Sequence, residues 1–589
     1  MSRNLLLVAA LVAIAALSVA PFILSSFTIS LFNYIGVYAL VAIGLALLTG
    51  VAGIVSFGQA AFVGVAAYAT AWATALNGYS PWIGLLLAIV TTCAVAAALG
   101  AATLRLEGHF LSLSTLAWGL AIGFLFGNIE GLGNFSGISN IPPIRIGAHP
   151  LMQSGEIYYL ILAFVVVALL LMYNLLDSRW GRAIRALRGG NVLVESLGVN
   201  AFQTKLAAFV IAAFLAALSG WLYAHMSRFV SPATFDAAMG IEYLMMAMVG
   251  GQGSMIGGVV GASIVTFLKN GIQDYLPLIS PNASGQLEVV AFAAIFIVFL
   301  QHARRGVVPY IADRLPLSPP ALPVAAAALG EREQPAAGAS LLKVDRATRR
   351  FGGLIAVSEV SFEVRAGEIV GLIGPNGAGK STMFNLLTGA LKLDGGAIEF
   401  SGLPIHRMPQ RAIARAGVAR TFQHVKLRPR MSVLDNVLLG AHSRLHSGLV
   451  RGLLRLDRAE EARARADAMR QLERTGLADH AFDAAGSLPL GKQRLVEIAR
   501  ALAANPTLLV LDEPAAGLRR NEKMELAALL RDLRAGDLTV LLVEHDMEFV
   551  MSLVDRIVVM DFGSKISEGL PAEVRADPRV QEAYLGGVA

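Results

Sequence analysis

Nine consecutive residues have the types and spacing that bind the phosphates of a nucleoside triphosphate. The glycines let the backbone wrap around a phosphate, and free amides at the start of the following helix point toward it. Lys380 is expected between the β- and γ-phosphates, and the Ser381 hydroxyl is expected to coordinate Mg²⁺. The segment therefore predicts binding of ATP or GTP. It consists of Gly374, Pro375, Asn376, Gly377, Ala378, Gly379, Lys380, Ser381 and Thr382.

The residues on either side predict the elements that hold this loop. Residues 368–373 form an apolar run typical of a buried strand, and residues 383–388 are typical of the start of a helix. The alternative is a glycine-rich turn with a purely structural role. With Gly-Lys-Ser-Thr intact, we expect that alternative in about one case in twenty.

Two later apolar runs end in polar residues suited to hydrolysing a phosphoanhydride. Residues 508–511 are followed by Asp512 and Glu513, so a buried strand would deliver two carboxylates at its tip. Asp512 is predicted to hold Mg²⁺, directly or through water, and Glu513 to polarise the attacking water. Residues 539–543 lead to His545, but a lone histidine is usually an ordinary core or surface residue.

The composition separates an apolar part of the chain from a soluble part. Of 589 residues, 55% are hydrophobic and 15% are charged, which is too apolar for a soluble protein of this size. The apolar residues concentrate in roughly the first 300 positions. The net charge of +6 is modest and no basic stripe alternates with aromatics, so nucleic acid is a poor candidate partner. The single cysteine, Cys93, excludes an internal disulfide.

The apolar part contains runs of membrane-spanning length, which predict roughly nine or ten spans, some of them broken. The first run resembles a secretory signal peptide. However, Pro21 would directly follow the cleavage site and further spans come next, so we predict that this run is not cleaved and stays as a helix. The runs cover residues 4–24, 30–49, 54–76, 82–104, 110–129, 157–176, 205–223, 241–268 and 287–300.

The loop charges orient these spans. If successive spans cross the membrane in alternating directions, most arginines fall in loops on one side of the membrane. The loop 130–156, on the other side, contains only one arginine, Arg145. Arg304 and Arg305, after the last run, fall on the arginine-rich side only if run 241–268 crosses the membrane as two helices. The glycine-rich residues 250–258 would be the break between them. Residues 50–64 are a second such patch, and the pair predicts either a substrate path or tight packing through small residues. The arginines are Arg3, Arg105, Arg179, Arg182, Arg185 and Arg188.

A segment rich in Pro and Ala, residues 316–340, predicts a tether between two domains. It separates a transmembrane domain, residues 1–315, from a soluble ATP-binding domain, residues 341–589. The tether begins on the side of Arg304 and Arg305, so the soluble domain is predicted to be cytoplasmic.

With these residues together, the soluble part resembles the ATP-binding subunit of ABC transporters over nearly its whole length. The resemblance implies that Lys380, Glu513 and His545 take part in catalysis, that Phe351 stacks on adenine, and that Gln423 joins Ser381 and Asp512 at Mg²⁺. It also implies that a signature segment contacts the ATP held by a partner ATPase. That segment is Leu488, Pro489, Leu490, Gly491 and Lys492.

Finer motifs point to the branched-chain amino-acid importer subgroup. In the soluble part they are residues 349–354, 420–424, 512–518 and 544–547, and in the membrane part residues 182–188, 196–200, 229–232 and 248–254. The membrane part is similar to a permease subunit, and the match implies that residues 188–200 dock on an ATPase as a coupling helix. The resemblance implies an all-α polytopic membrane domain fused to an α/β P-loop ATPase domain with a helical subdomain.

Two positions depart from the family pattern. Pro489 stands where a serine normally offers a hydroxyl, and proline also lacks a backbone donor. Arg519 replaces the usual Asn or Asp after Ala-Gly-Leu. Both positions act on nucleotide held by the partner. We therefore expect the composite site using Lys380 and Glu513 to hydrolyse ATP, and the one using Pro489 to be impaired.

The resemblance implies ATP-driven import of branched-chain or related amino acids across the bacterial inner membrane, with ATP and Mg²⁺ as cofactors. One permease domain and one ATPase domain need partners to form a complete transporter. These are a second permease and a second ATPase, or a second copy of this chain, together with a periplasmic binding protein. The alternatives are an importer of urea or short amides, a homodimeric exporter, and a nucleotide switch that transports nothing. Exporters of that type have about six long helices, which the short loops here disfavour.

Overall fold

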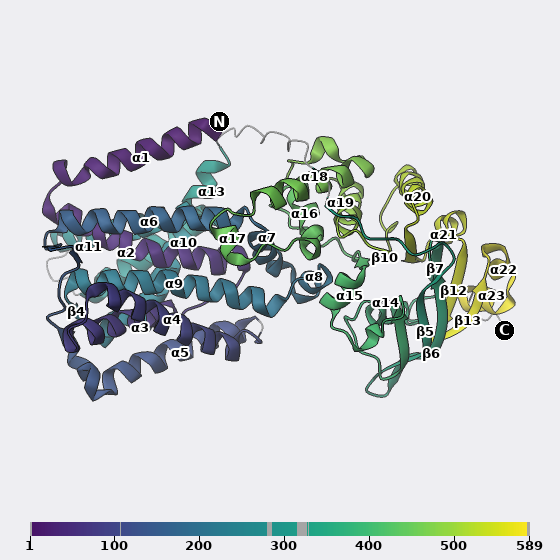
Figure 1. Ribbon diagram of the computed structural model, residues 1–589, viewed down its shortest axis with the longest axis horizontal. Coiled ribbons are helices and arrows are strands. Elements are labelled where there is room, and N and C mark those ends of the chain that lie inside the picture. The colour runs from purple at the N-terminus through teal and green to yellow at the C-terminus, as the bar shows by residue number, and fades with distance from the viewer. Residues whose placement is uncertain (1–2, 107, 280–284, 315–326, 328, 586–589) are drawn as a thin grey trace. The chain divides into compact units, whose positions relative to one another are not determined.

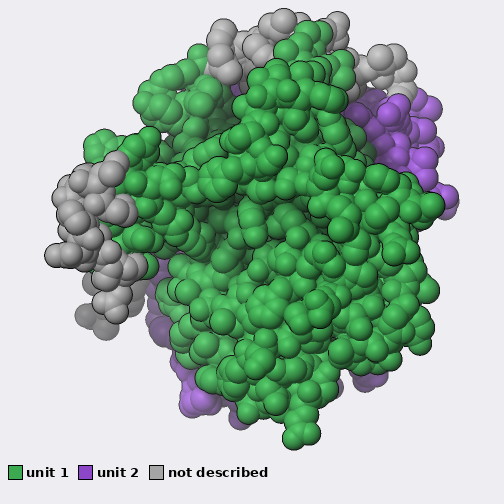
Figure 2. Space-filling model, turned by 90° about the vertical axis from the view of Figure 1, so that its left-hand side faces the viewer, with its two compact units in different colours: residues 1–177, 202–320 green, residues 178–201, 321–589 purple. Residues whose placement is uncertain are grey.

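The computed structural model describes residues 3–106, 108–279, 285–314, 327 and 329–585 (Figure 1). The chain divides into two compact units, coloured separately in Figure 2. Unit 1 is Met1–Asp177 with Phe202–Pro320, and unit 2 is Ser178–Ala201 with Ala321–Ala589. The segment Ser178–Ala201, which links two membrane helices, therefore belongs to the same unit as the nucleotide-binding residues.

Unit 1 is built mainly from a bundle of helices, as the sequence predicts. Seven of its described helices, some continued by a π-helical turn, are long and apolar enough to cross a membrane, and three shorter apolar helices complete the set of ten within the described residues. The helices are α1 (Arg3–Ile23), α2 (Ser26–Leu45) continued by the π-helix η1 (Ala46–Ala52), α3 (Gln59–Ala71) continued by the π-helix η2 (Trp72–Leu76), α4 (Pro81–Thr103), α5 (His109–Asn128), α6 (Ser154–Leu176), α9 (Ala201–Ser227), α10 (Ala237–Gly250), α11 (Met255–Ile279) and α12 (Gly285–His302).

The run predicted to be broken forms two helices. Helix α10 ends at Gly250, the chain reverses through Gly251 (φ 131°) and Gly253 (φ 86°), and α11 begins at Met255. Only glycine adopts such dihedrals without strain, so the glycines are what allow the reversal. The prediction of two helices here is confirmed.

Glycines also let these two helices approach until their backbones touch. A Cβ atom on Gly261 would lie 1.8 Å from the Met246 carbonyl oxygen, and one on Gly250 would lie 1.6 Å from the Gly257 carbonyl oxygen. The two glycine-rich patches meet as well, because a Cβ atom on Gly50 would lie 2.0 Å from the Gly253 amide nitrogen. Small residues commonly allow such close packing of membrane helices.

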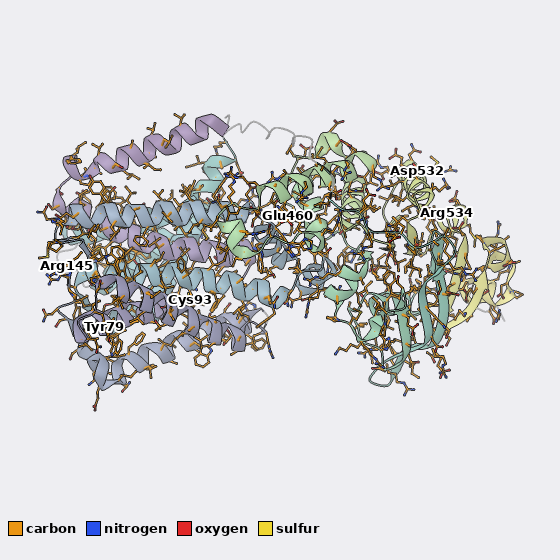
Figure 3. The ribbon with its side chains drawn as sticks, in the orientation of Figure 1. Tyr79, Cys93, Arg145, Glu460, Asp532 and Arg534 are labelled. Carbon is orange, nitrogen blue, oxygen red and sulfur yellow. The ribbon has the colours of Figure 1, made fainter. Side chains whose placement is uncertain are left out.

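The end of unit 1 that carries Tyr79 and Arg145 is closed by short strands and loops (Figure 3). Strand β1 (Ile138–Ser139) pairs with β4 (Phe229–Val230), and β2 (Arg145–Ile146) pairs with β3 (His149–Pro150). The Trp82 indole N–H donates to the Arg145 carbonyl oxygen at 2.9 Å, so α4 is fixed to this loop.

Unit 2 is built on a six-stranded sheet of order β13-β12-β7-β11-β10-β9, in which only β13 runs antiparallel to its neighbour. A three-stranded antiparallel sheet, β6-β5-β8, lies beside it. The strands are β5 (Ser340–Phe351), β6 (Leu354–Arg365), β7 (Ile369–Ile373), β8 (Gly395–Phe400), β9 (Val418–Arg420), β10 (Leu508–Asp512), β11 (Thr539–Val543), β12 (Arg556–Asp561) and β13 (Ser564–Gly569).

Three apolar clusters give unit 2 its layers. One joins the antiparallel sheet to one face of the six-stranded sheet and to α14, and a second covers the opposite face with α20 and α21. A third forms a helical subdomain from α16, α18 and α19. The helices of unit 2 are α7 (Arg179–Ala186), α8 (Asn191–Ser196), α14 (Lys380–Leu387), α15 (Gln410–Ala416), α16 (Val433–Gly440), α17 (Leu449–Leu453), α18 (Arg458–Arg474), α19 (Leu490–Leu502), α20 (Arg520–Ala535), α21 (Met547–Leu553), α22 (Pro571–Ala576) and α23 (Pro578–Leu585).

The predicted tether, residues 316–340, is described only in part, since residues 315–326 and 328 lie outside the described residues. From Leu329 onward the chain packs on unit 2. Leu329 is buried in the helical subdomain, the Arg332 guanidinium donates to the carbonyls of Ala416 and Arg415, and Gln334 donates to the Pro506 carbonyl. A free tether therefore remains a proposal for the residues before Leu329.

The contact between α10 and α11 gives a test of the close-packing argument. Gly261→Ala is expected to destabilise the protein by about 1–3 kcal/mol or more, because its methyl group has no room against the Met246 carbonyl. The measurement is the thermal unfolding midpoint of the detergent-solubilised chain.

Gly271→Ala, in the same helix, is the matched control. No atom lies within 4 Å of a Cβ there, so the change should be neutral or stabilise by up to about 1 kcal/mol. Equal unfolding midpoints for the two variants would contradict the close packing.

Candidate functional site

Three neighbouring parallel strands bring the predicted nucleotide-binding residues to one edge of the sheet. Strand β11 lies between β7 and β10, and Asp512 at the end of β10 is level with Val543 at the end of β11. All three strands are fully buried. Because the carboxyl ends of parallel strands share an edge, the loop after β7, the Asp512–Glu513 pair and His545 emerge together, which is where α/β sheets bind ligands.

The loop after β7 is shaped by glycines that no larger residue can replace. Gly374 (φ 154°) and Gly379 (φ 94°) have backbone dihedrals that side chains avoid. A Cβ atom on Gly374 would lie 2.1 Å from the Met560 carbonyl oxygen, and one on Gly379 would lie 2.3 Å from that of Ala356. The loop is thus held between β12 and β6, with its amides leading into α14.

Lys380, the first residue of α14, reaches back into this loop. Its ammonium group donates to the carbonyl oxygens of Gly374 at 2.7 Å and Pro375 at 2.9 Å, and the side chain is buried. Burial lowers the pKa of Lys380, and the Glu513 carboxylate partly offsets that effect. A phosphate group inside the loop would give this buried cation a direct anionic partner.

Glu513, Gln423 and His545 lie around one point at the edge of the sheet. The Gln423 side-chain amide donates to the Glu513 carboxylate at 3.1 Å, and His545 Nδ1 lies 3.7 Å from the same carboxylate. Glu513 has φ 46°, a left-handed conformation rare for a residue with a side chain. Its amide is fixed by the Val543 carbonyl at 2.9 Å. Backbone strain of this kind is frequent where function requires an aimed side chain.

The predicted Mg²⁺ ligands fit that ion in chemistry. Ser381, Gln423 and Asp512 offer a hydroxyl, an amide oxygen and a carboxylate, all hard oxygen donors. Burial raises the pKa of Asp512, and the Arg420 guanidinium opposes that rise. Among the described residues no cluster of three or more His, Cys, Asp or Glu can hold a metal alone. This agrees with an ion that keeps waters and phosphate oxygens among its ligands.

Two buried charged residues at this edge were not assigned a role from the sequence. The Glu544 carboxylate is fully buried and accepts from the amides of Ala515 at 2.6 Å and His545 at 3.1 Å. It therefore joins the chain after Glu513 to the chain that bears His545. Burial raises the pKa of Glu544, and these hydrogen bonds oppose the rise. In the sequence, the position of Glu544 directly after the apolar run 539–543 is the feature that points to it.

Arg420 is the second of these residues. Burial lowers its pKa to about 10, and its guanidinium lies 4.7 Å from the ring centroids of both Phe384 and Phe422. It donates to Thr388 at 2.7 Å, and so joins α14 to the segment that carries Gln423.

Phe351 ends β5 at the tip of the β5–β6 hairpin. Its ring is 44% exposed and carries the Arg349 guanidinium 4.9 Å from its centroid. The Ala356 carbonyl of the same hairpin adjoins Gly379. Phe351 thus offers an aromatic face on the element next to the phosphate loop, which a stacked base requires.

The signature segment leads into α19, with Pro489 immediately before the helix. Leu490 is 48% exposed and the Lys492 ammonium lies 2.7 Å from His480 Nε2. A Cβ atom on Gly491 would lie 2.5 Å from a Glu522 carboxylate oxygen. The Glu522 carboxylate therefore lies beside the first turn of α19. Leu488, the first residue of the segment, is buried and its carbonyl accepts from Gln493 at 2.7 Å.

Helix α19 is tied to the segment that bears Gln423. The Arg494 guanidinium donates to the carbonyl oxygens of Phe422 at 2.8 Å and Gln423 at 2.5 Å. A displacement of the signature helix is thus transmitted directly to the backbone of a predicted Mg²⁺ ligand.

Within unit 2, the Ser178–Ala201 segment is bound to the cassette by a buried ion pair. The Arg182 guanidinium makes two parallel hydrogen bonds to the Glu461 carboxylate, at 2.7 and 2.8 Å, and the two side chains are 3% and 11% exposed. Such two-pronged pairs are among the strongest charge-assisted contacts. The sequence predicted docking by residues 188–200, whereas the structure extends the contact back to α7. No pattern in the sequence marks Glu461 as the partner of Arg182.

Helix α8 and the residues that follow it make further contacts of this segment. The Arg411 guanidinium lies 3.4 Å from the Glu195 carboxylate, and Arg415 donates to the Gly198 carbonyl at 3.1 Å. Nearby, Glu460 (labelled in Figure 3) accepts from the amides of His446 and Ser447 at 2.6 and 2.9 Å. Helices α7 and α8 are therefore surrounded by α15, α17 and the start of α18.

Family models match the chain over three ranges. Residues 27–300 match a branched-chain amino acid transport system permease component, residues 357–516 an ABC transporter, and residues 564–589 a branched-chain amino acid ATP-binding cassette transporter. Both parts of the chain thus match models with compatible descriptions.

Individual proteins match the C-terminal part. The high-affinity branched-chain amino acid transport ATP-binding protein LivG of Salmonella typhimurium is 48% identical over 249 residues, which are 42% of this chain and 98% of LivG. The corresponding protein BraF of Pseudomonas aeruginosa is 44% identical over the same shares. A solved nucleotide-free ATP-binding cassette from an ABC transporter is 33% identical, with a TM-score of 0.38, and covers 42% of this chain and 100% of that one.

Glu544 gives a test of the site geometry. Glu544→Ala removes the acceptor that holds the Ala515 and His545 amides, so Glu513 and His545 lose their fixed positions. We expect the kcat of ATP hydrolysis to fall at least about tenfold with a small change in KM, because misplacement affects the chemical step more than binding.

The matched control is Glu548→Ala, which removes an exposed carboxylate from the same segment of chain and should keep the wild-type kcat. The steady-state rate of phosphate release checks both variants. An unchanged kcat for Glu544→Ala would contradict a positioning role.

Proposed function

Since the chain belongs to the family of branched-chain amino acid ABC transporters, with permease and ATP-binding parts in one polypeptide, we propose that it imports branched-chain or related amino acids across the bacterial inner membrane. It acts as the fused permease and ATPase of a multi-subunit importer. Its partners are a second permease, a second ATPase and a periplasmic binding protein that delivers the substrate.

The observation that carries this proposal is the position of the Ser178–Ala201 segment. It connects membrane helices α6 and α9 along the chain, yet it packs within the ATP-binding unit through Arg182 and Glu461. A movement of the cassette is therefore delivered to the two helices that flank the segment. Coupling of this kind is what an ATP-driven permease requires.

The nucleotide site performs the chemical step. Lys380 and the amides of the loop before it hold the β- and γ-phosphates, and Phe351 stacks on the adenine. Glu513 orients the attacking water and accepts its proton, while His545 contacts the γ-phosphate. Ser381, Gln423 and Asp512 would hold Mg²⁺, which would supply positive charge beside the phosphate oxygens.

ATP closes the two cassettes of the assembled importer on one another, and Arg494 conveys that closure between α19 and the Gln423 segment. Residues 178–201 move with the cassette, so the permease changes from outward to inward access. Hydrolysis then separates the cassettes and resets the permease.

The two composite ATP sites are proposed to be unequal. Pro489 lacks both a hydroxyl and an amide proton, and the Glu522 carboxylate beside Gly491 repels a phosphate bound across the interface. Arg519 adds a second departure on the same face of the cassette. The site built with Lys380 and Glu513 of this chain therefore supplies the ATP hydrolysis that drives transport.

The exporter alternative has less support. Within the described residues the longest membrane helices, α9 and α2 with its continuation η1, have 27 residues each, too few to cross a bilayer and extend far beyond it. The ten spans also exceed the about six expected of that class. Import of urea or short amides uses the same machinery, and transport assays with each solute distinguish it.

Transport assays test the proposed function. The chain, purified with its partners and reconstituted in liposomes with the binding protein, should accumulate labelled leucine only with ATP. Glu513→Gln should lower both ATP hydrolysis and leucine accumulation at least about 100-fold, since removal of one group that acts directly in a hydrolytic step has effects of this order.

Lys380→Ala should fail in the same assay, because phosphate binding is lost. Undiminished ATPase and uptake in Glu513→Gln would overturn the inequality of the two ATP sites. Wild-type accumulation in Lys380→Ala would overturn the proposed function itself.

The Arg182–Glu461 pair tests the coupling step. Arg182→Ala and Glu461→Ala each leave a buried charge unpaired, which costs about 3–5 kcal/mol in comparable pairs. Both variants should retain ATP hydrolysis but lose leucine uptake by at least about tenfold, because movement of the cassette no longer reaches α6 and α9.

The exchanged pair, Arg182→Glu with Glu461→Arg, should recover part of the uptake, and Arg458→Ala, on the exposed surface of α18, should have no effect. Equal uptake by Arg182→Ala and wild-type protein at equal ATPase rates would refute a coupling role.

A further inference from the structure

Residues 53–58 form an irregular stretch of backbone between two helical spans of unit 1. The π-helix η1 ends at Ala52, Gly53 takes a left-handed conformation (φ 76°), and α3 does not begin until Gln59. Along the stretch, burial alternates: Gly53 and Val55 are exposed, and Ile54 and Ser56 are buried. This alternation is that of an extended chain.

This stretch lies within the depth of the bundle and not at its edge. The Phe57 amide donates to the Thr115 hydroxyl at 3.1 Å, and Thr115 lies about 9 Å along α5 from its first residue. A Cβ atom on Gly240 would lie 2.6 Å from the Phe57 carbonyl oxygen, whereas Gly50 touches Gly253 just beyond the other end of α10. Gly50, in η1, and Phe57, near the end of the stretch, therefore lie about 15 Å apart along α10.

Non-helical backbone at such a depth is tolerated only where protein surrounds it or where it lines a path for solute. Two contacts with α5 fix the stretch in place, the Phe57–Thr115 bond and a bond of 3.4 Å from the Ser112 hydroxyl to the Val55 carbonyl oxygen. The backbone is thus held by protein, but the polar side chains that it carries are not.

Two side chains within one turn of the start of α3 are buried without any hydrogen bond. Gln59 is 1% exposed, and neither its amide nitrogen nor its amide oxygen has a partner among the described residues. Ser56 is fully buried, and within the same described ranges its hydroxyl also has no partner. Buried polar groups in proteins are nearly always hydrogen-bonded, so these three atoms together need an explanation.

Their position suits one chemical class of ligand. Helical side chains lean toward the N-terminus of their helix, so Gln59, the first residue of α3, leans over the free amides of the first turn. Those amides favour a carboxylate, and Gln59 provides both a donor for a carboxylate and an acceptor for an ammonium group. Ser56 provides one more group of each kind.

We propose that Gln59, Ser56 and the first turn of α3 form the binding site of the permease for the α-carboxylate and α-ammonium groups of an amino acid. The site is closed in this structure, and Gly53 and Gly58 flank the segment that must move to admit the solute. The inference rests on the proposed function and names the permease residues that contact the transported molecule.

Equilibrium binding tests the site. Labelled leucine is bound to the full complex in lipid nanodiscs without binding protein, in competition with leucine, leucinamide and 4-methylpentanoate. Leucine should compete at least tenfold better than leucinamide, which lacks the carboxylate. Gln59→Glu, which has the same size but adds a negative charge, should raise the Kd for leucine at least tenfold, and so should Gln59→Leu.

Two observations separate binding from structure. Gln59→Leu should unfold at the same temperature as wild type or higher, because it removes polar atoms that have no partner among the described residues. Thr92→Val is the matched control, since Thr92 in α4 is fully buried and its hydroxyl has no partner among the described residues. Its Kd should be that of wild type.

The outcomes are distinct. Unchanged leucine affinity in Gln59→Glu, or equal competition by leucinamide and leucine, would overturn this site while ATP-driven leucine uptake stood. Loss of affinity in Thr92→Val would overturn it too, because the effect would then follow from any buried hydroxyl or amide. Failure of the wild-type complex to accumulate leucine in the uptake assay would instead overturn the proposed function.

Discussion

A buried ion pair between Arg182 and Glu461 is the contact on which the rest of the molecule depends. Removing two charges from water is costly, and the attraction between them offsets that cost only with good geometry. The two parallel hydrogen bonds of this pair provide such geometry. Because Arg182 lies on the segment between α6 and α9, any displacement of α18 that moves Glu461 must also move that segment. Burial, together with the charges of Arg179, Arg182 and Arg415, lowers the pKa of His442 in the same region.

The nucleotide site also contains buried ionisable groups that a bound ligand would stabilise. The pKa of Lys380 is lowered and that of Asp512 is raised, both through burial. A bound phosphate would raise the pKa of Lys380, and bound Mg²⁺ would lower that of Asp512. Glu544 and Arg420 hold the surrounding loops in place with hydrogen bonds and ring contacts. The protein thus keeps its reactive groups in position before the ligand arrives, and the ligand supplies the missing charge.

A different constraint acts on unit 1. The interior of a membrane has no water to form hydrogen bonds with exposed backbone groups. Glycines let α10 and α11 approach until backbones touch, and the Gly50–Gly253 contact joins the two interrupted patches. Of the two interpretations offered by the sequence, the structure supports close packing, and the substrate path stays a proposal. Close packing accounts for Gly250, Gly257 and Gly261, whereas the stretch before α3 carries unpaired polar side chains that packing does not explain.

The sequence by itself determined the class of each part, because hydrophobic run length, loop charge and the strand–loop–helix context of Gly374 to Thr382 are local properties. It also determined that residues 241–268 had to be two helices, since charge placement fixes the parity of crossings. Only the tertiary structure decided which distant residues meet. Glu461 is 279 positions from Arg182, and no local pattern marks it as a partner. The same holds for Glu544 beneath Ala515 and for the unpaired atoms of Gln59, because a hydrogen bond, or its absence, is a property of the folded surroundings and not of the residue that carries the atoms.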